Sequence, residues 1–217
     1  TLSRGLGDVY KRQVLKGMSA GEIEAAYHKP GPLGGHNWHP MSFSPDTGYV
    51  YIPALDMPFG YGNEPGFVYE EGRWNLANDW RLGMPTGDKS VDSKVDGLLR
   101  GFISAWDPVE QKEVWRIQHA GTWNGGMLST AGNLIFQGNS AGYFVAYRAD
   151  TGEELWSAET QTGAIAPPVT YEVDGEQYVT IVAGWGGAFA LTAGAAEDYN
   201  LKPCLLYTSP SPRDRVQ

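Results

Sequence analysis

The sequence predicts an all-β fold made of stacked four-stranded units, as in a β-propeller, and an internal repeat is the main observation behind this. Residues 105–115, AWDPVEQKEVW, return 41 residues later as AYRADTGEELW at residues 146–156. Each copy has the pattern of a strand, a polar turn and a second strand that closes on tryptophan. A period near 41 residues is typical of propeller blades, which bury their faces by stacking on their neighbours. Turn residues also recur about every 8–12 residues, which is the spacing of an all-β protein.

The individual elements follow from these patterns in chain order. Residues 19–27 hold the one helix-like pattern, with Ser19 as N-cap and Glu22 three residues later. Residues 45–48, PDTG, predict a hairpin turn. Residues 56–98 break the strand rhythm and predict a long ordered insertion, which either serves function or covers a blade edge. Strands are expected at 41–44, 49–52, 101–106, 126–129, 133–137, 143–147, 154–156, 169–173 and 177–182. They amount to about three blades, fewer than a closed propeller needs.

The tryptophans that close the two repeat copies are expected to be structural. Trp115 and Trp156 have the same place in the repeat, so they should occupy equivalent, largely buried positions in consecutive blades. A buried aromatic ring removes about 150–250 Å² from water, and its removal costs roughly 3–5 kcal/mol. We therefore expect each indole to fill the gap between its blade and the next.

The two ends of the chain do not read as parts of a folded domain. Residues 3–13, SRGLGDVYKRQ, and 204–214, CLLYTSPSPRD, can be encoded on opposite strands of one DNA segment, shifted by one frame, as a sequencing adapter read through at both ends of a metagenomic fragment would be. We expect residues 1–13 and 204–217 to be non-native and residues 14–203 to be the native segment. The one cysteine, Cys204, then carries no information on redox compartment.

The charge balance excludes some classes of partner. Without these ends the chain keeps 11 basic and 23 acidic residues, a net charge of −12. Nucleic acids and anionic membrane surfaces bind basic patches, so neither is expected as a partner. The apolar runs in the sequence are also shorter than the ~18 residues that a membrane helix needs.

Two stretches are unusual for plain strands and predict a binding site. Residues 34–40, GGHNWHP, open one strand unit, and residues 184–189, GWGGAF, follow the last predicted strand. Glycines let a backbone approach a ligand closely, and Asn and Trp donate N–H hydrogen bonds to oxygen atoms without adding charge. His36 and His39 do not predict a metal site, because two histidines lack the further ligands that such a site requires.

Residues 34–191 resemble the C-terminal part of the propeller of the pyrroloquinoline quinone (PQQ) dependent alcohol dehydrogenases, the quinoprotein and quinohaemoprotein group. The resemblance rests on GGHNWHPMSFSPDTGYVYIPA (34–54), AWDPVEQKEVWR (105–116), TWNGGMLSTAGNLIFQG (122–138) and YEVDGEQYVTIVAGWGGAFAL (171–191), which occur in family order. It implies an eight-bladed propeller with PQQ and calcium on its axis. The chain would then be a part of a longer enzyme.

The resemblance also implies which residues contact the cofactor. Asn37 and Trp38 match an Asn-Trp pair that contacts PQQ, and Ala188 matches the last PQQ contact. Trp123 matches a tryptophan close to the cofactor and substrate cavity, and both Trp123 and Trp185 either line this cavity, as cofactor contacts, or belong to the core. The catalytic aspartate, the calcium ligands and a basic partner of PQQ should precede residue 14, so no catalytic or metal-binding residue is expected in this chain.

The implied function is that of an oxidoreductase. The parent enzyme is expected to be a periplasmic quinoprotein that oxidises primary alcohols to aldehydes and passes electrons to cytochrome c or a quinone, while this chain alone should be inactive. Whether a haem c domain follows Pro203 stays open. The alternatives are a PQQ dehydrogenase for sugars or polyols and a non-catalytic propeller scaffold of the bacterial envelope.

Overall fold

A computed structural model describes most of the central part of the chain. It covers three short strand segments, 18–19, 22–23 and 26–28, and from residue 30 to residue 185 all residues except 58, 65, 73–74, 80–99 and 120. The chain forms two compact units, Thr1–Pro32 with Met57–Leu98 and Leu33–Asp56 with Leu99–Gln217. The predicted ends at 1–13 and 204–217, and Ala188, lie outside the described residues.

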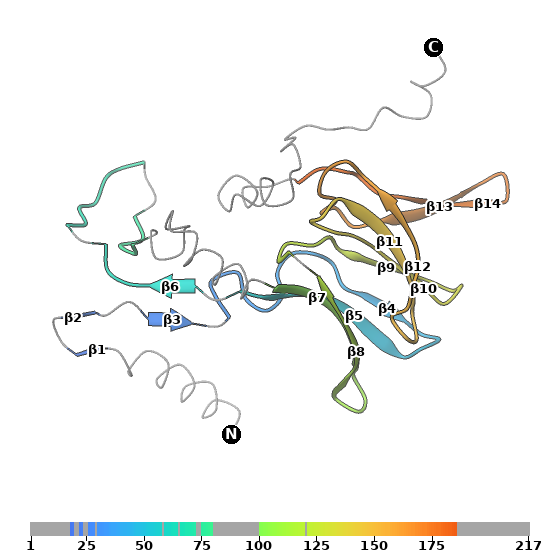
Figure 1. Ribbon diagram of the computed structural model, residues 1–217, viewed down its shortest axis with the longest axis horizontal. Coiled ribbons are helices and arrows are strands. Elements are labelled where there is room, and N and C mark those ends of the chain that lie inside the picture. The colour runs from blue at the N-terminus through green and yellow to red at the C-terminus, as the bar shows by residue number, and fades with distance from the viewer. Residues whose placement is uncertain are drawn as a thin grey trace, which may run out of the picture. The chain divides into compact units, whose positions relative to one another are not determined.

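The larger unit contains two four-stranded antiparallel sheets of the same design (Figure 1). In the first sheet, of order β4-β5-β7-β8, the strands are β4 (Ser42–Ser44), β5 (Tyr49–Asp56), β7 (Arg100–Asp107) and β8 (Lys112–His119). In the second, of order β9-β10-β11-β12, they are β9 (Met127–Thr130), β10 (Leu134–Gly138), β11 (Tyr143–Arg148) and β12 (Glu154–Glu159). A further hairpin follows, β13 (Val169–Val173) and β14 (Glu176–Thr180). The predicted all-β fold with repeated four-stranded units is confirmed.

The repeat is visible in the strand register. Ala105 pairs with Trp115, and Ala146 pairs with Trp156. Directly after each pair the register shifts by one residue, so that β8 and β12, the last strands of the two sheets, each carry a β-bulge next to their tryptophan. A bulge bends the strand and increases its twist. β8 and β12 therefore bend at the same point of the repeat.

The main hydrophobic core lies between the two sheets. Its buried residues are Tyr51, Ile103 and Ala105 from the first sheet and Met127, Ile135, Val145, Tyr147 and Ala149 from the second sheet, where Ala149 belongs to the turn between β11 and β12. The alternation of the strands places these side chains on the facing surfaces. The sheets thus stack face to face, which is how a blade that cannot bury its own face becomes stable.

Trp115 joins the first sheet to a turn of the second. Its Nε1–H donates to the backbone oxygen of Ala149 at 3.2 Å, and the Tyr51 hydroxyl donates to the same oxygen at 3.0 Å. Gly152 has a φ of +76°, and a Cβ atom there would lie 2.9 Å from the Trp115 ring. Glycine is required at this turn both by its backbone conformation and by the close indole. The predicted docking role of Trp115 is confirmed.

Trp156 departs from the expectation of burial. Its side chain is 51% exposed, although it packs edge to face on Phe144 with ring centroids 5.9 Å apart. The physical reason lies in the segment that would cover the indole. The turn that covers Trp115 belongs to the next sheet, and its counterpart over Trp156 would lie 41 residues further on, past residue 185, where the described part ends. The prediction that both indoles are largely buried is wrong for Trp156, and Trp115 is partly buried in the described structure.

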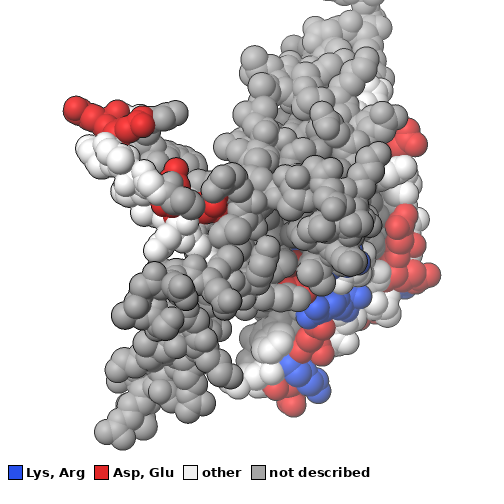
Figure 2. Space-filling model, turned by 60° about the vertical axis from the view of Figure 1, so that its left-hand side comes forward, with Lys and Arg blue, Asp and Glu red and all other residues white. Residues whose placement is uncertain are grey.

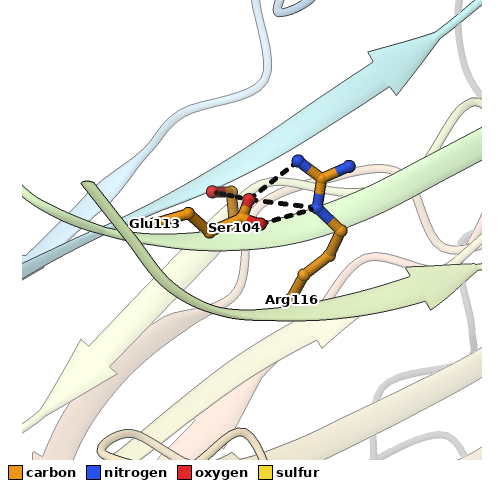
Figure 3. A network of polar contacts seen from close by, with 3 residues as sticks. All are labelled: Ser104, Glu113 and Arg116. Carbon is orange, nitrogen blue, oxygen red and sulfur yellow. Dashed lines mark hydrogen bonds and ion pairs between the residues drawn. The ribbon is translucent and has the colours of Figure 1, made fainter.

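A polar cluster lies on the first sheet and links β7 to β8 (Figure 3). The Ser104 hydroxyl donates to Glu113 at 2.6 Å, and the Arg116 guanidinium donates to the same carboxylate at 2.8 Å and also lies 3.8 Å from the Phe102 ring centroid. The hydrogen bond from Arg116 lowers the pKa of Glu113 from its usual value. On the face drawn in Figure 2 the visible basic side chains lie beside acidic ones, as in this cluster.

The smaller unit shows that the helix prediction for residues 19–27 is wrong. This segment forms parts of three short strands, β1 (Met18–Ser19), β2 (Glu22–Ile23) and β3 (Ala26–His28), and β3 pairs with β6 (Phe59–Tyr61). Ser19 of β1 pairs with Glu22 of β2 instead of capping a helix. A helix of nine residues is marginal in water, so pairing with a neighbouring strand outweighs the local helix signal.

The predicted insertion at 56–98 is ordered where the structure describes it. Asn63 and Asn78 form an isolated antiparallel bridge, Asp79 N–H donates to the Gly62 oxygen at 2.9 Å, and Gly62 N–H donates to the Asn78 side chain at 3.0 Å. These bonds close the segment into an irregular hairpin. Within the described residues no helix has the length and apolar character of a membrane span.

Candidate functional site

The predicted Asn-Trp pair lies in the segment that leads into β4, at one end of the first sheet. Two hydrogen bonds fix this segment to the end of β5. The Leu55 N–H donates to the Gly35 oxygen at 2.8 Å, and His36 Nδ1 lies 2.8 Å from the Pro53 oxygen. Since a carbonyl oxygen only accepts, His36 Nδ1 carries the hydrogen. The segment is therefore held to β5 at residues 35 and 36.

The Asn37 side chain is partly occupied by the backbone around it. Its Nδ2 donates to the Leu33 oxygen at 2.9 Å, and its Oδ1 accepts from Trp38 N–H at 2.8 Å. An amide group has two N–H hydrogens and two oxygen lone pairs. Half-buried Asn37 thus keeps one hydrogen and one lone pair for another partner, and its orientation is fixed before any ligand arrives.

Trp38, His39 and Trp123 form a compact cluster of three rings. The Trp38 and His39 rings are stacked, with centroids 4.1 Å apart and an interplanar angle of 24°. The Trp123 ring meets the His39 ring edge to face at 4.6 Å and the Trp38 ring at 6.1 Å. Such offset and edge-to-face arrangements are the favourable ones for aromatic rings. Trp38 is 57% exposed, whereas Trp123 is 5% and His39 2% exposed, so the cluster presents the Trp38 indole to solvent on a buried support.

The imidazole of His39 is held in its neutral form. Burial lowers the pKa of His39 from 6.5 to about 4, and the nearby His36 adds to this effect. Its Nε2 atom is buried and has no hydrogen-bond partner among the described residues. At neutral pH the cluster therefore consists of three uncharged rings.

A hydrophobic cluster lies beneath these rings. Trp123 packs with Leu55, Ile165 and Trp185, and Trp185 is 2% exposed. A Cβ atom on Gly163 would lie 2.7 Å from the Trp185 ring, so a glycine is needed for the indole to fit. Trp123 and Trp185 thus belong to the core in the described structure, and direct contact of either ring with a cofactor stays a prediction.

Three of these residues hold the same place in consecutive strand units. Trp38, Trp123 and Ile165 each stand four residues before the first strand of their unit, which is β4, β9 and β13, respectively. The sequence contains this signal only to within one residue, because counting back four positions from the expected strands at 41–44, 126–129 and 169–173 gives residues 37, 122 and 165. The structure thereby gathers Asn37, Trp38, Trp123 and Trp185 at one end of the strand array, while Ala188 lies outside the described residues.

A buried polar network at the same end joins the two sheets. His119 Nε2 and Gln137 Oε1 lie 2.8 Å apart, and Gln137 Nε2 donates to the Gly125 oxygen at 2.8 Å. Asn124 Oδ1 accepts from the Ser140 N–H at 3.1 Å. Because the Gln137 oxygen accepts, His119 carries its hydrogen on Nε2, and burial lowers the pKa of His119. Sequence reasoning missed this network, since the polar residues are far apart in the chain.

The described residues identify no metal site. Among residues 30–185, outside the gaps in their description, no three His, Cys, Asp or Glu side chains gather closely enough to hold an ion. The arrangement offers instead an oriented amide beside an exposed indole. Such groups can hold a flat, oxygen-rich ring by stacking and hydrogen bonding.

Comparison with known proteins connects this geometry to one class of enzymes. Residues 100–179 match a family model described as PQQ, glucose/ethanol/alcohol dehydrogenase, beta-propeller domain. The chain is 46% identical over 171 residues to the quinohemoprotein alcohol dehydrogenase of Comamonas testosteroni, covering 77% of this chain and 24% of that protein. It is equally 46% identical to the 1-butanol dehydrogenase (cytochrome c) of Thauera butanivorans, with the same shares covered.

Solved structures give the same result. The quinohemoprotein alcohol dehydrogenase ADHIIG from Pseudomonas putida HK5 superposes with a TM-score of 0.76 at 39% identity, over 88% of this chain and 30% of that one. A europium-containing methanol dehydrogenase superposes with a TM-score of 0.56 at 29% identity, over 73% of this chain and 27% of that one. The chain spans about a quarter of the length of the curated relatives it matches. The two four-stranded sheets are therefore blades of a partial propeller.

Proposed function

Because this chain belongs to the family of PQQ-dependent alcohol dehydrogenases and covers part of their propeller, we propose that it forms one wall of the cofactor chamber of an alcohol-oxidising quinoprotein. One observation carries the proposal. Asn37 and Trp38, which match the family's cofactor contacts, lie side by side at one end of the strand array, with the amide oriented and the indole exposed. Both groups are supported by buried neighbours and need little rearrangement to bind.

The residues of this chain fit one part of such a cofactor. PQQ is a planar quinone with three carboxylates, and it would supply the oxidising carbonyl group of the reaction. Trp38 would cover part of the flat ring system, and the free hydrogen of Asn37 Nδ2 would donate to one of its oxygens. The segment from Leu33 to Pro40 contains no Lys or Arg, so the charge that offsets the carboxylates must come from other residues.

The role of these residues is to bind and orient. The two backbone hydrogen bonds of Asn37 hold its amide in one rotamer, which lowers the entropy cost of binding. The hydrophobic layer of Leu55, Trp123, Ile165 and Trp185 keeps water from the underside of the Trp38 platform. Neither Asn37 nor Trp38 moves a proton, and a catalytic base has to be provided outside residues 14–203.

The finer features of the parent enzyme belong to the same proposal. It oxidises primary alcohols to aldehydes in the periplasm, uses calcium with PQQ, and passes electrons to cytochrome c or a quinone. In the longer protein, residues 14–203 are the native segment and the adapter-like ends are not. The relative named 1-butanol dehydrogenase (cytochrome c) supports both the type of substrate and the type of acceptor.

The first test is cofactor binding by the 217-residue chain. We expect PQQ, added with calcium, to bind weakly or not at all, because the segment around Asn37 has no cation to offset three carboxylates. Quenching of tryptophan fluorescence measures the binding. Oxidation of an alcohol with a dye as electron acceptor by this chain alone would contradict the proposal.

The second test uses the intact gene. The full-length protein should bind PQQ and oxidise alcohols, and Asn37→Ala should lower its activity about 10- to 100-fold through lost positioning. Gln177→Ala is the matched control, because it also removes an amide but from exposed β14. Equal activity of both variants would show that Asn37 does not contact the cofactor. A full-length protein that binds no PQQ would favour the scaffold alternative.

A further inference from the structure

His39 is an unusual choice for the position that it holds. It is 2% exposed, stacks on Trp38 at 4.1 Å and meets Trp123 edge to face at 4.6 Å. A phenyl ring would make similar contacts without burying a nitrogen. The Nε2 atom of His39 has no hydrogen-bond partner among the described residues, and such a buried group lowers the stability of the fold. The contacts by which His39 acts in the described structure are therefore those of its ring.

These ring contacts determine where the Trp38 indole lies. Trp38 is 57% exposed, so it has few other neighbours to restrict its side-chain torsions. The stacking angle of 24° with His39 sets the plane of the indole. His39 in turn is held against buried Trp123, which packs with Leu55 and Ile165. The core thus holds the imidazole of His39, and this imidazole in turn holds the exposed ring of Trp38 in one orientation.

We propose that His39 is a positioning residue that fixes the plane of the Trp38 indole for contact with the quinone cofactor. The reference to the cofactor rests on the function proposed above, whereas the effect on Trp38 does not. Without the imidazole, Trp38 would sample several rotamers and would lose part of its affinity to their ordering when the cofactor binds. His39 itself needs no contact with the cofactor or the substrate.

The geometry offers a readout that requires no cofactor. Trp38 and Trp123 have ring centroids 6.1 Å apart and planes at 63° to each other. Two close, non-parallel indoles couple their electronic transitions and give a paired positive and negative band in far-ultraviolet circular dichroism. The amplitude of this couplet depends on distance and angle, so it reports whether Trp38 keeps its plane.

The experiment compares variants of the 217-residue chain. Trp38→Phe should abolish the couplet and so assign it. His39→Ala and His39→Leu, which remove the planar ring, should reduce it by about twofold or more, while His39→Phe, which keeps a ring, should retain most of it. His119→Ala is the matched control, because it removes the other buried imidazole of the described residues, which contacts Gln137 in a separate polar network. The β-sheet band, recorded for each variant, monitors the fold.

Three results would overturn the proposal. The first is a couplet that persists unchanged in His39→Ala. The second is the absence, in the unsubstituted chain, of any couplet that Trp38→Phe removes. Loss of the β-sheet band in both His39→Ala and His39→Leu would assign His39 to the fold and not to Trp38. In the full-length protein His39→Ala should raise the dissociation constant of PQQ about 3- to 10-fold. If that protein binds no PQQ although the couplet results hold, the proposed function fails and the positioning of Trp38 stands.

Discussion

Replacing Trp115 by alanine should destabilise the chain far more than the same change at Trp156, although the two residues have the same place in the repeat. Trp115 packs against the inter-sheet core, its ring lies 5.7 Å from that of Tyr51, and it donates to the Ala149 oxygen. Removing a buried aromatic ring costs roughly 3–5 kcal/mol, and a half-buried one correspondingly less. The Ala149 oxygen keeps its bond from Tyr51, so no unpaired carbonyl is added to the cost.

We therefore expect a loss of about 3 kcal/mol for Trp115→Ala. Trp156 is 51% exposed, and about half of its ring is already in water, so Trp156→Ala should cost about 1–1.5 kcal/mol. Urea unfolding followed by circular dichroism measures both. With a slope of about 2–3 kcal/mol per M, the midpoint should fall by roughly 1–1.5 M for Trp115→Ala and by about 0.5 M for Trp156→Ala.

Equal losses at the two positions would refute this reasoning. They would mean either that Trp156 is docked as firmly as Trp115 or that neither indole contributes through the neighbouring sheet. Trp115→Phe separates the two parts of the effect. Since phenylalanine keeps most of the ring but cannot donate to Ala149, a loss of about 1 kcal/mol is expected.

Two further predictions concern packing and pH. Gly101→Ala should lower the free energy of unfolding in urea by about 2–3 kcal/mol, because its Cβ atom would overlap backbone oxygens, including that of Thr122 at 2.8 Å. Gly132→Ala is the control and should be neutral, since the nearest atom to its Cβ lies at 3.8 Å. Equal effects of the two substitutions would contradict the close approach at Gly101. The lowered pKa of His39, about 4 when folded against 6.5 when unfolded, means that the unfolded chain binds more protons between these values. The free energy of unfolding should thus be highest above pH 6.5 and fall by about 3 kcal/mol as the pH is lowered to 4. His39→Phe removes the titrating group, so this variant should show a smaller fall than the unsubstituted chain. An identical pH dependence in both proteins would mean that His39 is not buried in its neutral form.

The sequence predicts the sheets well and the tryptophan environments only in part. The 41-residue repeat identifies β7, β8, β11 and β12, and the PDTG turn identifies the hairpin of β4 and β5. These signals are local, because strands and turns depend on residues close in the chain. The burial of Trp156 is not a local property, since it depends on which segment of another blade lies over the indole. Identical places in a repeat therefore do not imply identical surroundings.

The site shows the same limit. Asn37 and Trp38 can be identified from the sequence because they form one motif, and the structure places them at one end of the strand array. The ring contact between His39 and Trp123 joins residues 84 positions apart, so no local pattern reveals it. The helix prediction around Ser19 fails for a related reason, because the pairing of β3 with β6 involves a distant strand.

The contact between Trp115 and the turn at Ala149–Gly152 has a consequence for how such proteins can be recombined. Indole, carbonyl oxygen and glycine are complementary parts of one joint, but they are carried by consecutive repeats. A chimera that exchanges one whole four-stranded sheet between relatives separates the parts of two such joints, one at each side. A crossover between Trp115 and β9, followed by a second one a full period later, separates Trp115 from the turn that it contacts. An exchanged segment that runs from Tyr51 through Gly152 keeps this joint intact, because the indole and the turn then come from the same relative. The unit to be exchanged as a whole is thus the junction between two blades. Chimeras that keep these junctions intact should fold more often than chimeras that exchange single sheets.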